Sequence, residues 1–295
     1  MAETLLTVIA VLLRILSNPV GNVFQKQLTI RGNHPLLVNF LTYLLLSGAS
    51  LAGLFYFDWG VLPFDFWLFS VLGGITGALG NGFLVRALQL GDLSVLGPIN
   101  AYKSVVGVVF GVFLLGEVPN LWGVLGIGLI IFGSYFVLDT TPERFSWRLL
   151  KKPEIQYRIW AMILTAIEAV FIKKIILASS TIIAFMSWCF FGAVFSFLLL
   201  LVYGVDLKKE TQSLKTGHLG TYVLLILSVG TMQLTTNYAF EHMPVGYALS
   251  LFQLSTLVSV FFGHRIFQER DIRKKLIGSV IMIVGSAVII FLNTA

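Results

Sequence analysis

Three ionisable side chains lie deep inside long apolar stretches of the sequence: Arg14, Lys103 and Glu168. A charge at the centre of a bilayer costs roughly 2.5 kcal/mol or more, so each of them needs a partner or a wet cavity. Arg14 and Lys103 have the chemistry to hold a carboxylate or a phosphate, and Glu168 can hold an amine or a coupling proton. The structural alternative is an ion pair between Lys103 and Glu168, with Arg14 reaching the interface along its long stem.

Amide side chains accompany these charges. In the stretch that contains Arg14, the residues Asn18, Asn22 and Gln25 recur at helical spacing and share one face. Each amide can orient a polar solute, or it can join two helices, a bond that contributes about 0.6–2 kcal/mol in membranes. With an aromatic wall added, the candidate substrate contacts are Lys103, Arg14, Asn18, Asn22, Asn100, Trp188, Gln233, Asn237 and Gln253, and Glu168 is the candidate coupling residue.

The elements that carry these residues are ten apolar runs. The chain of 295 residues is 57% hydrophobic and 12% charged, with a mean hydropathy of +0.90, and a soluble domain carries about twice that charge. Runs of this length cross a bilayer as helices, because only helices satisfy the backbone there. They fall at 5–28, 35–56, 66–90, 94–116, 121–138, 158–178, 181–204, 217–240, 245–267 and 275–293. The predicted fold class is all-α integral membrane, with Pro19 as a candidate gating kink in the first helix.

The two halves of the chain resemble each other. Residues 87–138, shifted by 152, align with 239–290 without a gap and place Glu117 on Glu269. A shift of 147 places Lys26 on Lys173. Because five helices per half is an odd number, the second half must enter the membrane in the opposite sense, as two inverted five-helix repeats. The predicted division is 1–138 for the first repeat, 139–157 for a polar linker and 158–295 for the second repeat.

Glu117 and Glu269 each end a helix at equivalent positions, which indicates a structural or a gating role at these corners. Sixteen of the 20 Lys and Arg residues lie in or beside connections on one side, so the net charge of +6 sets membrane orientation and does not indicate nucleic acid. This count places both termini outside the cytoplasm. The single cysteine, Cys189, has no disulfide partner, and no catalytic, metal-binding, cofactor-binding or Walker pattern is present in the sequence.

Gly97-Pro98-Ile99-Asn100-Ala101-Tyr102, the Gly116-Glu117 pair and the spaced glycines 126 and 133 form a motif set that the second half repeats. The set resembles the repeat signature of EamA-type transporters in the drug/metabolite transporter superfamily. The second repeat departs from it, with Ser250 in place of the proline and Gln268 in place of the glycine. The resemblance implies alternating access around a cavity between helices 1–4 and 6–9, substrates from amino acids to sugar phosphates and drugs, and cytoplasmic termini, which conflicts with the charge count.

These patterns together predict a secondary active transporter of the plasma membrane, not an enzyme, that exports a small anionic or zwitterionic solute such as an amino acid. A proton or a counter-substrate would drive it, and the protein would be a monomer or homodimer. One alternative is a flippase for a lipid-linked headgroup, with Lys26 and Arg86 at the rim of a lateral opening. The other is a partner subunit without transport activity, which leaves the charges inside the membrane unexplained.

Overall fold

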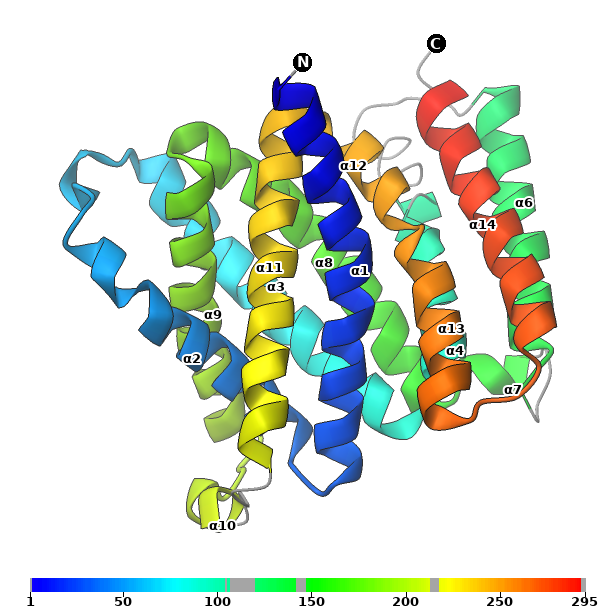
Figure 1. Cartoon of the computed structure of the whole chain (residues 1–295), viewed down its shortest axis with the longest axis horizontal. Coiled ribbons are helices and arrows are strands. Elements are labelled where there is room, and N and C mark those ends of the chain that lie inside the picture. Colours follow the sequence, from blue (N-terminus) through cyan, green and yellow to red (C-terminus); the bar gives the residue numbers. More distant parts are fainter. Residues whose placement is uncertain (1, 104, 107–119, 142–146, 213–217, 293–295) are drawn as a thin grey trace.

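The computed structural model describes residues 2–103, 105–106, 120–141, 147–212 and 218–292. The described residues form helices and connections (Figure 1). The long helices are α1 (Ala2–Ile30), α2 (Pro35–Leu54), α3 (Phe64–Leu90), α6 (Leu121–Leu138), α8 (Pro153–Ala178), α9 (Thr181–Val202), α11 (Leu219–His242), α13 (Ser255–Phe267) and α14 (Ile272–Leu292). The shorter ones are η1 (Trp59–Val61), α4 (Leu93–Leu96), η2 (Pro98–Ala101), α7 (Trp147–Leu150), α10 (Leu207–Gln212) and α12 (Val245–Phe252).

The predicted all-α membrane fold is confirmed. Five of the described helices, α1, α3, α6, α9 and α11, are long and apolar enough to cross a membrane. Within the described residues, nine of the ten predicted runs are helical. The tenth, 94–116, begins as α4 and η2 and then passes outside the described residues. Large apolar side chains such as Leu12, Leu201 and Leu227 are exposed, as a lipid-facing surface requires.

Two predicted helices differ from their predicted bounds by more than the two or three residues seen at the ends of the others. The run 158–178 begins five residues earlier, because Pro153 takes the first helical position and Glu154 lies in the first turn. The run 245–267 is divided into α12 and α13 by a turn at Gln253 and Leu254. Pro19, in contrast, lies inside α1, which remains helical on both sides of it.

The pairs of helices that pack together are related by the same symmetry as the two repeats. The most extensive contacts join α3 to α8, α1 to α11, α2 to α9 and α6 to α14. Exchanging the two halves converts the first pair into the second and leaves the third and fourth unchanged. In Figure 1 the start of α1 and the end of α14 lie at one end of the molecule, and α7 and α10 lie toward the other. We call this second end the basic end, because the connections there carry most of the Lys and Arg residues.

Repeat-related glycines bring α6 and α14 into backbone contact. Gly126 faces Gly285, and Gly133 faces Gly278. A Cβ atom on Gly133 would lie 2.6 Å from the carbonyl oxygen of Gly278, and one on Gly278 would lie 2.5 Å from that of Gly133. Small residues at this spacing permit close helix association in membranes. The pair α6 and α14 lies beside the other helices in Figure 1.

Candidate functional site

A polar cavity of about 100 Å³ lies between α1, α3, α8, α9, α11, α12 and the segment that contains η2 and Lys103. A smaller one of about 30 Å³ adjoins it and shares Asn18, Asn22 and Asn81 of its lining. The polar lining of the main cavity is Arg14, Asn18, Asn22, Asn81, Asn100, Lys103, Arg158, Thr165, Glu168, Trp188, Gln233 and Thr236. Eight of the ten residues named from the sequence as substrate or coupling contacts therefore line one cavity, although they come from α1, from η2 and the residues just after it, and from α8, α9 and α11.

The other two, Asn237 and Gln253, lie behind the lining. Asn237 is fully buried, and its amide is joined to that of Gln233 by a hydrogen bond of 2.8 Å. Gln253 donates to the main-chain oxygen of Asn100 at 3.2 Å. Both residues therefore position cavity-lining groups and do not form the surface of the cavity.

Arg14 is held in place but retains an unused donor. Its Nε donates to Oγ1 of Thr236 at 2.8 Å, and its guanidinium lies 4.7 Å from the ring centroid of Phe252. Its Nη1 is buried without a hydrogen-bond partner among the described residues. A buried donor without a partner costs about 1–3 kcal/mol or more, so an anion bound in the cavity would satisfy it.

Glu168 lies among aromatic and amide groups. Its Oε1 accepts a hydrogen bond of 2.8 Å from the indole nitrogen of Trp188. Trp188 packs on Tyr43 with ring centroids 4.6 Å apart, and Asn81 donates to the Tyr43 hydroxyl at 2.5 Å. The described residues show no ion pair between Lys103 and Glu168, so the structural alternative for these two charges is not formed in this conformation.

The sequence prediction missed Arg158, which it counted with the basic residues of a connection. Arg158 is buried, and it donates to the main-chain oxygen of Leu96 at 2.7 Å and to Oδ1 of Asn100 at 3.0 Å. The helical path breaks between α4 and η2, at Gly97 and Pro98, so the Leu96 oxygen can accept from a side chain. The start signal at Pro153 and Glu154 would have placed Arg158 inside the helix and not in a connection.

Both halves interrupt a helix at the cavity. The first half breaks at η2, and the second breaks between α12 and α13. Under the shift of 152, Ala101 at the end of η2 corresponds to Gln253 at the second break. The bond from Gln253 to the Asn100 oxygen joins the two breaks directly. Discontinuous helices that meet at the interface of two repeats are typical of transporter binding sites.

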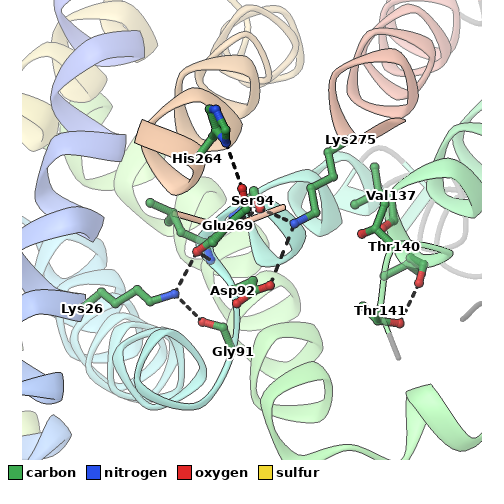
Figure 2. A network of polar contacts seen from close by, with 12 residues as sticks. Lys26, Gly91, Asp92, Ser94, Val137, Thr140, Thr141, His264, Glu269 and Lys275 are labelled. Carbon is green, nitrogen blue, oxygen red and sulfur yellow. Dashed lines mark hydrogen bonds and ion pairs between the residues drawn. The ribbon is translucent and has the colours of Figure 1, made fainter. Parts of the chain in front are cut away.

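A second polar cluster lies at the basic end, around Glu269 (Figure 2). The carboxylate accepts from the main-chain nitrogens of Leu93 and Ser94 at 2.8 Å each, and from the Ser94 hydroxyl. Lys26 forms an ion pair with it at 3.0 Å, and Lys275 donates to the Ser94 hydroxyl at 2.8 Å. We call Lys26, Ser94, Glu269 and Lys275 the Glu269 cluster.

In this cluster Lys26 is buried, and it does not lie at an open rim as the flippase alternative placed it. The Lys26 side chain is 8% exposed, and it also donates to the Gly91 oxygen at 2.8 Å. Glu269 lies at the N-terminus of α4, where a carboxylate is favourable. Burial opposes its ionisation, but the charge of Lys26 and the hydrogen bonds from Ser94 outweigh that effect and lower the pKa of the Glu269 carboxyl. Its repeat equivalent, Glu117, lies outside the described residues.

The helices, the repeat-related breaks and the polar cavity define a multi-pass membrane transporter. The chain belongs to the EamA-like transporter family, whose model matches residues 5–139 and again residues 153–291. The predicted superfamily is thereby confirmed. Within the part of the chain that the structure describes, no group of His, Cys, Asp and Glu residues could hold a metal ion.

One curated protein and one solved structure are similar to this chain. One is named an uncharacterized transporter in the cobO 3' region of Sinorhizobium sp., and it is 39% identical over 74 residues. That alignment covers 25% of this chain and 52% of the relative, so the chain spans about half the length of this curated relative. The other is a solved crystal structure with a TM-score of 0.64 and 17% identity, aligned over 99% of this chain and 97% of that one. At this identity the likeness shows the fold alone.

Proposed function

We propose that the protein is a secondary carrier that moves a small organic anion or zwitterion by alternating access, in the direction of export. The observation that supports this most directly is the charge of the cavity lining. Among the described residues that line the cavity, Arg14, Lys103 and Arg158 contribute three cations, and Glu168 contributes one carboxylate. Uncompensated charge inside a membrane is expensive, so a bound carboxylate or phosphate stabilises this lining where a cation would not.

The free donor identifies where the anionic group binds. Arg158 uses its Nε and one terminal nitrogen to hold Leu96 and Asn100 in place. Arg14 bonds to Thr236 through its Nε, which leaves its terminal Nη1 for a ligand. A guanidinium presents its donors in a planar fork that fits a carboxylate. Arg14 is therefore the proposed primary anion contact, with Lys103 as the second.

The part of the cavity lining around Glu168 suits an amine, a hydroxyl or an apolar part of the solute. Glu168 can accept a hydrogen bond from an amine or a hydroxyl of the solute, and Asn81 can accept or donate one. Trp188 can pack against an apolar segment of the solute. The cavity is also small, with a volume of about 100 Å³. In this conformation it suits a compact solute such as an amino acid or a short carboxylic acid better than a nucleotide sugar.

A thermal-shift screen of the detergent-purified chain tests this proposal. Wild type is compared with Arg14→Gln, Lys103→Ala and Glu168→Gln, and with Lys174→Gln as a control, because Lys174 is an exposed lysine of α8 outside the cavity. A ligand at 100 times its Kd stabilises the folded state by about 2.7 kcal/mol. We expect a compact carboxylate to raise the melting temperature of wild type and Lys174→Gln by several degrees, and to leave Arg14→Gln unshifted. Stabilisation by organic cations alone, or an equal response of Arg14→Gln, would refute the anion-binding assignment.

A flippase for a lipid-linked headgroup is the second candidate. An apolar cleft of about 290 Å³ lies between α2, α3 and α9, lined in part by Trp59, Trp67, Phe190 and Phe191, and it could take a lipid tail. However, Lys26, one of the two basic residues expected at the rim, is buried in an ion pair. Competition between a soluble carboxylate and a lipid headgroup in a transport assay distinguishes the two functions.

A further inference from the structure

The Glu269 cluster joins four segments from both halves of the chain. Lys26 lies at the end of α1 and Ser94 lies in α4, both in the first half. Glu269 follows α13, and Lys275 lies in the first turns of α14, both in the second half. The bonds from Lys26 and Ser94 to Glu269, and from Lys275 to Ser94, therefore all cross between the halves (Figure 2). Any motion that separates the halves at this end must break these bonds.

The cluster lies between the cavity and the basic end. Lys26 is one helical turn beyond Asn22, which lines the cavity, in the direction of the basic end. Ser94 precedes Leu96, whose oxygen accepts from the cavity residue Arg158. The cluster therefore blocks the route from the cavity between α1, α4 and α13.

Burial shows that this route is closed. The side chains of Lys26 and Glu269 are 8% and 4% exposed, and the neighbouring Leu93 and Leu96 are almost fully buried. Glycine brings α13 close to α4 at this point, since a Cβ on Gly263 would lie 2.9 Å from the Cβ of Ser94. Side chains packed this closely exclude water, so a polar solute cannot pass while the cluster is intact.

The geometry points to the Glu269 cluster as a latch that closes the substrate cavity toward the basic end and opens during transport. This inference rests on the proposed carrier function, because only a carrier must alternate between closed and open ends. Glu269 is the central group: it pairs with Lys26 and also caps α4 through two main-chain nitrogens. Removing the charge of Glu269 weakens both the ion pair with Lys26 and the cap on α4, whereas removing Lys26 leaves the cap on α4 in place.

Thiol accessibility tests the latch without any substrate. The native Cys189 is buried and is first replaced by Ala. Ala169, a small residue of the cavity lining, is then changed to Cys as the reporter. A membrane-impermeant maleimide is applied from each side of the membrane in turn. A separate chain with Lys209→Cys, an exposed position in α10 at the basic end, identifies which side that end faces.

The decisive variants are Glu269→Gln and Lys26→Met, each combined with the Ala169→Cys reporter. The control is Lys274→Gln, which removes a charge from an ion pair at the same end (3.4 Å to Asp139) where the Lys274 side chain is 58% exposed. We expect both latch variants to react about tenfold faster than the parent from the basic end, and the control to react at the parent rate. A tenfold shift corresponds to about 1.4 kcal/mol.

An unchanged rate from the basic end, in a latch variant that melts cooperatively, would overturn the latch. If Glu269→Gln does not fold because α4 has lost its cap, Lys26→Met alone decides the question. The result is separable from the proposed function, since a faster reaction in both latch variants would stand even if no carboxylate bound to wild type. Conversely, ligand binding with no change in accessibility would retain the carrier and reject the latch.

Discussion

The backbone contact between α6 and α14 leads to a quantitative prediction for Gly133→Ala. The added Cβ would lie 2.6 Å from the Gly278 oxygen and 2.9 Å from the Met282 nitrogen, both main-chain atoms that cannot move aside alone. Comfortable contacts of this kind begin near about 3.5 Å, so the helices must separate by roughly 1 Å. Overpacking of this kind costs about 1–3 kcal/mol, while Ala in place of Gly returns up to about 1 kcal/mol of helix propensity. We expect Gly133→Ala to destabilise the protein by about 1–2 kcal/mol.

The same helix supplies the matched control. A Cβ on Gly128 would have no described atom within 4 Å, so Gly128→Ala should be neutral or stabilising by up to about 1 kcal/mol. Both variants are compared with wild type by unfolding in detergent, with the helical circular dichroism signal as the readout. The double variant Gly133→Ala, Gly278→Ala should cost less than the sum of the two singles, because the first methyl already separates the helices. Equal stability of Gly133→Ala and Gly128→Ala would refute the close packing of α6 on α14.

The other predictions concern the basic end and the orientation of the chain. The pKa of the Glu269 carboxyl is lowered from its ordinary 4.5, so its charge stabilises the folded state above that pH. The difference in melting temperature between wild type and Glu269→Gln should therefore shrink as the pH falls below 4.5. A difference that stays constant with pH would contradict this. Gln268 has a φ of 57°, in the left-handed region that favours glycine, and the residue that corresponds to it in the first repeat of the sequence is Gly116. Gln268→Gly should therefore be neutral or stabilising by up to about 1 kcal/mol in thermal melts, and a loss of stability would count against it. In a Cys189→Ala chain, single cysteines at Tyr56 and Lys209 should react with an impermeant maleimide from opposite sides, and the charge count places Lys209 in the cytoplasm; labelling of both from one side would refute the topology.

The sequence determined the class of protein and most of the polar lining of the cavity. A bilayer offers no hydrogen-bond partners to the backbone, so long apolar runs must become helices whatever their tertiary contacts. For the same reason a charge inside such a run must face the interior. Arg14, Lys103 and Glu168 could thus be assigned to one interior cavity before any contact was known, and the repeat indicated how the halves relate.

Only the tertiary structure decided the roles of Lys26, Arg158 and Glu269. Lys26 and Glu269 are 243 positions apart in the chain, and no local pattern specifies that they meet. A lysine near a helix end is equally suited to an interface and to a buried ion pair, and the difference depends on which segment packs above it. Arg158 likewise has its role because the break at Gly97 and Pro98 leaves the Leu96 oxygen free to accept from it. Residue type and spacing specify what a side chain can do, and packing between distant segments decides which of those possibilities is realised.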